Sequence, residues 1–356
     1  MIQIDGSFGE GGGQILRTAL SLSIMTARAF RVENIRSNRR KPGLLPQHLS
    51  AVRAAAALSG AAVTGDRLGA TELTFAPARP AKHGDYLFDV AETAERGSAG
   101  SVTLVLQTLL VPLALSKGDS TLLIRGGTHV EWSPPFDHFV NSYLPALRMM
   151  GFRVDAELNR WGWYPAGGGE VACHLQVRAG RRDVPRPKAL KLLQRGPLRR
   201  IAGRAIAANL PTHIPQRMAD WARKSLRDPD VPVDIEARCV TAACPGAGVF
   251  FTAEYEELAA SFSALGRPGK PSEAVAEAAL AAFFAHHASG AAVELYLSDQ
   301  LLLPLAVGAR DAVFTVAKPT GHLSTNAWTI GRFGVADITV EAGTPSRVSI
   351  EPRAVS

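Results

Sequence analysis

The glycine-rich segment 6–13 is the first place where this sequence could do chemistry. It follows an alternating segment typical of a strand and precedes an apolar helical pattern, so its backbone N–H groups and the helix dipole favour a bound anion. Gln14 and Arg17, three residues apart at the start of that helix, would point the same way. Glu10 fits such a site only if a divalent cation lies between its carboxylate and a phosphate. The alternative is an ordinary turn in which Glu10 complements the helix dipole.

A second cluster of polar residues follows the next predicted strand. Arg36, Arg39, Arg40 and Lys41 fall within six residues, and Gln47 comes at the start of a predicted helix. Arginines at the end of a strand, followed by a loop that prolines restrict, could clamp phosphate groups. Charge alone leaves a solvated basic loop open as the alternative.

Four further features complete the candidates. Taken singly, Asp299 indicates the N-terminal end of a helix, and His322 indicates a hydrogen-bonded loop histidine. Gln107 interrupts an otherwise apolar helical pattern. The segment 132–137 offers aromatic and proline surfaces that could stack a base or pack against a core.

The elements that must hold these residues recur along the chain. The order strand, helix, strand, helix, strand, strand is predicted twice, in units of roughly 80–90 residues. The first unit comprises segments 1–5, 11–25, 30–36, 46–58, 61–65 and 72–76. The second comprises segments 86–90, 100–116, 120–125, 134–150, 153–158 and 169–177. The repeated order and spacing suggest duplication of one α/β unit.

The repetition breaks at a junction rich in proline and arginine, 181–187, and a second breaker follows at 266–271. An alanine-rich helix is predicted from about Ser272. The earlier style then resumes with a helix at 301–307, a strand at 312–317 and a helix after Thr325.

We therefore expect an α/β (α+β) fold with a large domain of three repeated βαβαββ-type units and a smaller inserted α/β domain. The expected divisions are 1–183 for the first part of the large domain, 184–280 for the inserted domain and 281–356 for completion of the third unit.

Composition excludes several classes of protein. The 356 residues are 46% hydrophobic and 20% charged, which is too apolar for a disordered chain. The longest apolar segment, 102–115, is shorter than the ~18 residues of a membrane-spanning helix. No secretory signal is visible at the start, and the three cysteines form no CxxC pair. We expect reduced thiols and a cytoplasmic protein.

The charge balance favours an anionic partner. Lys and Arg number 39 against 32 Asp and Glu, a formal net charge of +7. Ten basic residues lie between Arg178 and Arg204, where Asp183 is the one acidic residue. This cluster could contact nucleic acid, or it could be a solvated face.

Taken together, these segments resemble the RNA 3'-terminal phosphate cyclase family over nearly the whole chain. The resemblance rests on ordered motifs, which are 9–17 (GEGGGQILR), 41–44 (KPGL), 47–49 (QHL), 97–100 (GSAG), 164–169 (YPAGGG), 299–301 (DQL) and 347–351 (RVSIE). Many motifs in one order are more specific than any one of them.

The resemblance implies a fold and a reaction. The fold is a large domain of units like the C-terminal domain of a translation initiation factor, with a smaller inserted domain. In the reaction, a histidine attacks the α-phosphate of ATP and forms covalent histidine-AMP. AMP then passes to an RNA 3'-phosphate, and the neighbouring 2'-hydroxyl displaces AMP to close a 2',3'-cyclic phosphate.

The resemblance also implies roles for individual residues. His322 would be the nucleophile, and Glu10 would hold a divalent metal, magnesium or manganese, near the triphosphate. The residues implied to embrace the β- and γ-phosphates are Gln14, Arg17, Arg36, Arg39 and Gln47. Those implied to line the nucleotide pocket are Gln107, Tyr296, Leu297, Ser298, Asp299 and Gln300, and segment 134–136 would face adenine.

The implied partners are ATP and an RNA with a 3'-phosphate end, with no membrane and with a monomer or a homodimer both open. A cyclase-like ribosome-assembly factor, which lacks the nucleophilic histidine, is the alternative. The presence of His322, Glu10, Arg17 and Asp299 favours the enzyme. Enolpyruvyl transferases are built from similar α/β units but do not share these motifs. Formation of covalent AMP would separate the enzyme from both alternatives.

Overall fold

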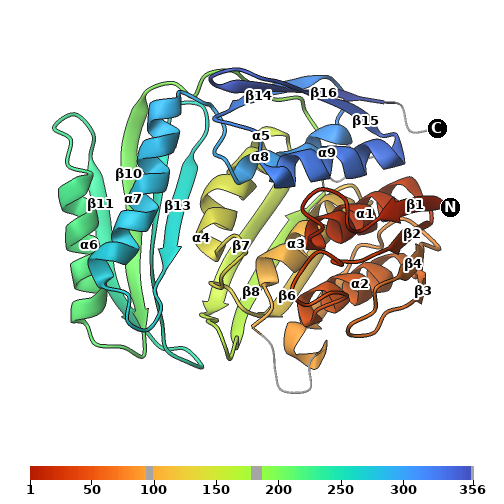
Figure 1. Cartoon of the computed structure of the whole chain (residues 1–356), viewed down its shortest axis with the longest axis horizontal. Coiled ribbons are helices and arrows are strands. Elements are labelled where there is room, and N and C mark those ends of the chain that lie inside the picture. Colours follow the sequence, from red (N-terminus) through yellow and green to blue (C-terminus); the bar gives the residue numbers. More distant parts are fainter. Residues whose placement is uncertain (94–98, 178–186, 354–356) are drawn as a thin grey trace.

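A computed structural model describes residues 1–93, 99–177 and 187–353, which form four four-stranded sheets with helices packed on them (Figure 1). Each sheet contains one parallel pair of strands and two antiparallel pairs. The predicted mixed α/β class is confirmed at this level.

The first sheet has the strand order β1-β2-β4-β3. Its strands are β1 (Ile2–Asp5), β2 (Phe30–Glu33), β3 (Ala62–Thr64) and β4 (Leu73–Ala76), and its helices are α1 (Gly13–Thr26) and α2 (Pro46–Ser59). Strand β1 alternates buried Ile2 and Ile4 with exposed residues, so one face of the sheet meets the core.

The second sheet repeats this arrangement, with the order β5-β6-β8-β7. Its strands are β5 (Asp85–Asp89), β6 (Ser120–Gly126), β7 (Arg153–Arg160) and β8 (Gly169–Gln176). Its helices are η1 (Val90–Thr93), α3 (Val102–Ala114), α4 (Phe136–His138), η2 (Phe139–Tyr143) and α5 (Leu144–Met149). The segment predicted as one helix at 134–150 is thus a short α-helical turn, a wider π-helical turn and a second α-helix.

A third sheet of the same kind joins residues far apart in the sequence, in the order β9-β14-β16-β15. Its strands are β9 (Lys191–Leu192), β14 (Ala312–Val316), β15 (Ala336–Glu341) and β16 (Ser346–Pro352), and its helices are α8 (Leu297–Ala306) and α9 (Gly321–Phe333). In chain order, all three sheets place their strands as first, second, fourth and third.

The remaining sheet lies between β9 and α8 in the sequence and has a different order, β11-β10-β12-β13. Its strands are β10 (Leu198–Ala208), β11 (Val233–Val240), β12 (Gly246–Tyr255) and β13 (Ala260–Leu265), and its helices are α6 (His213–Ser225) and α7 (Ser272–Ser289). Figure 1 shows it on the left of the molecule, with α6 and α7 side by side on one face.

Hydrophobic packing follows the same division. One large cluster of buried side chains spans the three sheets of like order, and a second cluster lies between the β10–β13 sheet and its helices. The predicted domain limit between 183 and 184 falls outside the described residues. The predicted limit at 280 falls within helix α7, which is continuous from Ser272 to Ser289.

Two predicted helices near the C-terminus begin earlier than expected. Helix α8 starts at Leu297 instead of residue 301, because the Glu294 carboxylate accepts hydrogen bonds from the N–H groups of Tyr296 and Leu297. Helix α9 starts at Gly321 instead of after Thr325. Across the described residues, no helix combines the length and the apolar character that crossing a bilayer requires.

Candidate active site

The glycine-rich loop between β1 and α1 packs directly against the first turns of α9. Gly9 has a φ of 57°, and a Cβ atom there would collide with Thr325 Oγ1. The backbone N–H of Glu10 donates to the same oxygen at 3.3 Å. Phe8 stacks on Trp328, with 4.1 Å between ring centroids. The predicted anion-binding loop therefore lies on the helix that carries the predicted nucleophile.

His322 occupies the first turn of α9, beside this loop. Thr320 caps the helix by accepting the Leu323 N–H at 3.0 Å. His322 Nε2 lies 3.1 Å from Glu10 Oε2, and within the described structure its buried Nδ1 has no hydrogen-bond partner. Burial lowers the pKa of His322 below its usual 6.5, against the opposing charge of Glu10. The imidazole is therefore neutral at pH 7, the form that can act as a nucleophile.

Glu10 is shared between a histidine and an arginine. Its Oε2 also lies 3.6 Å from Arg39 Nη2. Among the residues that the structure describes, no three His, Cys, Asp or Glu side chains gather as a metal site. A lone carboxylate fits Mg²⁺ or Mn²⁺ if the ion takes its other ligands from phosphate oxygens and water. The donor set is thus compatible with a cation that arrives with the nucleotide.

Arg17, on the helix that follows the loop, interacts electrostatically with Asp299. Arg17 Nη2 donates to Gln14 Oε1 at 2.7 Å, as their spacing on α1 predicts. Burial lowers the pKa of Arg17 to about 10, and the Asp299 carboxylate opposes this shift. Burial raises the pKa of Asp299 to about 7, and Arg17 opposes that shift. Residues 282 positions apart in the sequence (Arg17 and Asp299) are thus brought into one electrostatic site.

Asn326 joins three helices at this site, and sequence reasoning gave it no role. Its Oδ1 accepts from Thr18 Oγ1 of α1 at 2.7 Å, and its Nδ2 donates to the carbonyl of Asp299 in α8 at 2.7 Å. Asn326 and Thr18 are both buried. The sequence offered one signal for Asn326, which is its position one helical turn after His322 on the same face of the helix.

The basic segment after β2 is held by its own backbone. Arg36 Nη1 donates to the carbonyls of Lys41 and Gly43 at 2.6 and 2.9 Å. The guanidinium of Arg36 is therefore partly engaged in holding the loop, whereas Arg39 is exposed and turned toward Glu10. Gln47 Oε1 accepts the Ser101 N–H at 3.4 Å, which links α2 to the start of α3.

The residues predicted to line a nucleotide pocket divide into two groups. Gln107 Nε2 donates to Gln300 Oε1 at 2.9 Å, and His138 Nε2 lies 3.3 Å from the same oxygen. Burial lowers the pKa of His138, which sequence reasoning did not single out, to about 4. Tyr296 is exposed and accepts from Gln300 Nε2 through its carbonyl at 2.9 Å. Gln107, His138 and Gln300 thus form one polar cluster from three helices, beside the exposed Tyr296.

Leu297 and Ser298 form the second group, because both side chains are fully buried. Ser298 Oγ donates to the Leu295 carbonyl at 2.6 Å. Their side chains therefore support the pocket from the core side and offer no polar atom to its surface.

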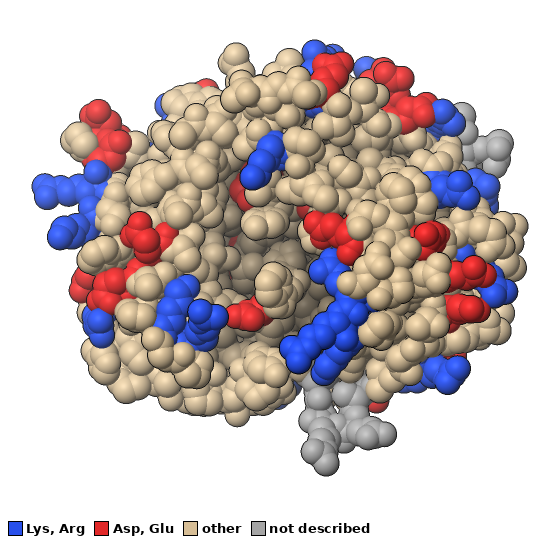
Figure 2. All heavy atoms as spheres, in the orientation of Figure 1, with Lys and Arg blue, Asp and Glu red and all other residues tan. Residues whose placement is uncertain are grey.

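The basic cluster between 178 and 204 is less uniform than its charge suggests. Arg178, Arg181, Arg182 and Arg186 lie outside the described residues. Arg199 and Arg200 pair with Glu256 and Asp234, and Arg204 pairs with Asp137. Arg195 donates to backbone carbonyls of α7 and the residues after it. Figure 2 shows acidic and basic side chains interspersed on the face turned to the viewer, around a hollow near the middle of the molecule.

Comparisons with known proteins identify the family of this chain. The family model for RNA 3'-terminal phosphate cyclase matches residues 8–340. A protein named RNA 3'-terminal phosphate cyclase from Methylococcus capsulatus is 53% identical over 97% of this chain and 95% of its own length. Proteins of the same name from Gloeothece citriformis and Archaeoglobus fulgidus are 47% and 40% identical, over 95% and 94% of this chain and 95% of each relative.

A solved structure, the enolpyruvyl transferase NikO from Streptomyces tendae, aligns with 50% of this chain and 33% of its own at a TM-score of 0.27 and 14% identity. That likeness is too low to support an argument about fold. The family match covers most of the chain and the relatives match nearly all of it. The chain therefore belongs to the RNA 3'-terminal phosphate cyclase family.

Proposed function

We propose that this chain is an ATP-dependent enzyme that converts an RNA 3'-phosphate to a 2',3'-cyclic phosphate through covalent His322-AMP. The names of its relatives support the reaction. The observation that carries the mechanism is a neutral His322 whose Nε2 lies 3.1 Å from Glu10, where the first turn of α9 meets the loop before α1. We further propose that the three sheets of like order form one large domain of repeated units, with the β10–β13 sheet inserted.

The proposed reaction has three steps, and each step forms one bond to phosphorus while another breaks. A nitrogen of His322 forms a bond to the α-phosphorus of ATP while the bond to pyrophosphate breaks. An RNA 3'-phosphate oxygen then forms a bond to the phosphorus of AMP while the bond to His322 breaks, and protonation of the imidazole makes it a good leaving group. Finally the adjacent 2'-hydroxyl attacks the 3'-phosphorus, loses its proton and expels AMP. The anhydride bond to AMP activates the 3'-phosphate, and the proximity of the 2'-hydroxyl lowers the barrier to closing that ring.

We propose the nucleotide contacts that the family resemblance implies, and the positions of several of these side chains support them. The N-terminus of α1, with Gly12 as its cap and no capping side chain, would receive the β- and γ-phosphates together with Gln14, Arg17, Arg36, Arg39 and Gln47. Glu10 would hold Mg²⁺ or Mn²⁺, which when bound supplies positive charge to the triphosphate. Tyr296, Gln300 and Gln107 would face the nucleoside, with Asp299 below them.

The proposal is tested by incubating the protein with α-labelled ATP and magnesium, without RNA, followed by a denaturing gel and label mapping. We expect an acid-labile, alkali-stable label on His322 in the unmodified chain and no label in His322→Ala. His213→Ala is the matched control, because His213 is an exposed histidine at the start of α6. Label that persists in His322→Ala would refute the assignment of the nucleophile.

A folded protein that takes no label with either magnesium or manganese would favour the non-catalytic RNA-processing factor instead. If label forms, supplying an RNA with a 3'-phosphate should discharge it and yield a cyclic end. An RNA with a 3'-hydroxyl should leave the label in place, since it offers no phosphate oxygen to accept AMP.

A further inference from the structure

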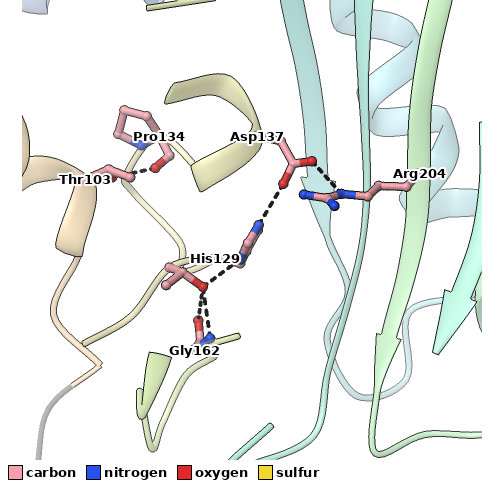
Figure 3. A network of polar contacts seen from close by, with 7 residues as sticks. Thr103, His129, Pro134, Asp137, Gly162 and Arg204 are labelled. Atoms are coloured by element: carbon pink, nitrogen blue, oxygen red, sulfur yellow. Dashed lines mark hydrogen bonds and ion pairs between the residues drawn. The ribbon is translucent and has the colours of Figure 1, made fainter. Parts of the chain in front are cut away.

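A buried network of charged and polar side chains joins the β10–β13 sheet to the neighbouring unit (Figure 3). One carboxylate oxygen of Asp137 accepts a hydrogen bond from Arg204 Nε at 2.8 Å. The other oxygen lies 2.8 Å from His129 Nε2. The other ring nitrogen of His129 lies 2.8 Å from Thr128 Oγ1, which also accepts the Gly162 N–H at 2.9 Å. Each member is thus oriented by the next.

The network is enclosed by aromatic rings. His129 is buried and stacks on Trp161 and Trp163, with 4.5 and 5.2 Å between ring centroids. The guanidinium of Arg204 lies 4.9 Å from the centre of the Trp161 ring. Burial opposes ionisation of Asp137, but His129 and Arg204 outweigh it, so the pKa of Asp137 is lowered. A buried carboxylate of this kind needs its cation, because losing one partner of such a pair leaves an uncompensated charge.

The two ends of the network belong to different parts of the fold. Asp137 lies in α4, within the unit of the second sheet, and Arg204 lies in β10 of the inserted sheet. A second link lies nearby, where Ser142 Oγ donates to Ser261 Oγ of β13 at 2.8 Å. The inserted sheet therefore holds the α4–η2 segment at two points along its length.

The same segment forms part of the proposed nucleotide pocket. Asp137 lies between Phe136, in the segment expected to face adenine, and His138, which contacts Gln300. The segment begins at Pro134, whose carbonyl accepts a hydrogen bond from Thr103 Oγ1 at 2.6 Å. It continues into the π-helical turn η2, a widened geometry that is frequent at functional sites.

We propose that Asp137 is a positioning residue for the base-binding side of the nucleotide pocket and that Arg204 fixes it from the inserted sheet. The inference rests on the proposed function, and it gives the inserted sheet a task in nucleotide selection. The phosphates are served by other elements, the N-terminus of α1 and the loop before α2. A displaced α4 therefore alters where the base lies while leaving the phosphate site intact.

The test measures His322 labelling at varied ATP and GTP concentrations, without RNA, in Arg204→Met. We expect the KM for ATP to rise about tenfold at a nearly unchanged maximal rate, and the preference for ATP over GTP to fall, since small misplacements of bound groups are costly. Arg204→Lys should recover part of both, because it restores the charge without the Nε contact. Arg200→Met is the matched control, because Arg200 lies on the same strand in an exposed pair with Asp234.

The preference for ATP over GTP distinguishes a positioning role from a merely structural one. Loss of a structural contact would lower labelling by ATP and GTP alike, whereas loss of a positioning contact would change the preference. A folded Arg204→Met with the KM and the ATP preference of Arg200→Met overturns the inference. If Arg204→Met does not fold, Asp137→Asn, which keeps the shape of the side chain, takes its place with the same two outcomes. If the unmodified chain forms no covalent AMP, the proposed function fails separately. Equilibrium binding of ATP and GTP then supplies the same comparison.

Discussion

At the scale of single residues, the candidate site contains groups whose pKa values burial shifts from their ordinary values. His322 is kept neutral by burial although Glu10 lies beside it. Asp299 titrates near neutrality, with a pKa raised to about 7 by burial. Such groups gather at functional sites because chemistry near pH 7 needs them there. The side chains that keep them in place matter as much as the groups themselves.

Asn326 provides the first prediction at this scale. Asn326→Ala removes two hydrogen bonds of 2.7 Å, so that the Thr18 hydroxyl keeps only its 3.4 Å contact from Gln14 Nε2 and the Asp299 carbonyl loses a side-chain donor. We expect a loss of about 1–3 kcal/mol in the free energy of unfolding, because each of the two lost hydrogen bonds contributes about 0.5–1.5 kcal/mol. We also expect slower labelling of His322, since α9 loses its attachment to α1 and α8.

The measurements are urea unfolding and the rate of labelling at saturating ATP. Asn159→Ala is the control, because the exposed Asn159 donates to Glu170 at 3.3 Å on a distant strand. Equal stability and equal labelling rates in the two variants would show that Asn326 is dispensable.

At the scale of elements, the contact between the glycine-rich loop and α9 leaves no room for a side chain at Gly9. Gly9→Ala places a methyl group against Thr325 Oγ1 and adds the cost of a left-handed backbone, about 1 kcal/mol or more. We expect the loop to move off α9, so that labelling of His322 falls sharply. The double variant Gly9→Ala with Thr325→Ala should recover part of the labelling, because the colliding oxygen is gone.

Gly69→Ala separates the collision from the backbone cost. Gly69 has a φ of 73°, and a Cβ there would meet nothing within 4 Å. We expect it to lower thermal stability without affecting labelling. Failure of the double variant to exceed Gly9→Ala in labelling would exclude the collision as the cause.

The elements also show what the sequence could and could not reveal. Hydrophobic periodicity predicted α1, α2 and most strands of the first two sheets to within a few residues. It missed the starts of α8 and α9, because these are set by Glu294 and Thr320 accepting backbone N–H groups. Cap bonds of this kind depend on side-chain geometry and leave no periodic signal.

The residues of the candidate site were likewise predictable only where a local motif pointed to them. Motifs and resemblance predicted Glu10, Arg17 and His322, which the structure places together. Nothing in the sequence pointed to Arg204 approaching Asp137, because that contact joins strand β10 to helix α4 between residues 67 positions apart. Long-range pairs of this sort follow from packing and not from local pattern.

At the scale of the whole molecule, buried histidines occur both in the units of the three sheets of like order and in helix α7, which packs on the β10–β13 sheet. Burial lowers the pKa of His48 to about 3 and those of His138 and His286 to about 4. Each folded pKa is depressed, so between the folded value and 6.5 the unfolded chain binds more protons than the folded chain. Stability is therefore complete above pH 6.5 and falls as the pH drops toward 4.

His286 tests this argument, because in the described structure neither of its buried ring nitrogens has a hydrogen-bond partner. It packs against Tyr255 and Phe262, with centroids 5.8 and 5.7 Å away, so His286→Leu loses no polar contact. At pH 5 one such histidine costs on the order of 2 kcal/mol relative to pH 7. Urea midpoints of His286→Leu should therefore fall less between pH 7 and pH 5 than those of the unmodified chain. His213→Leu, at an exposed position, should keep the original slope, and parallel slopes for all three proteins would mean that His286 is not a source of acid sensitivity.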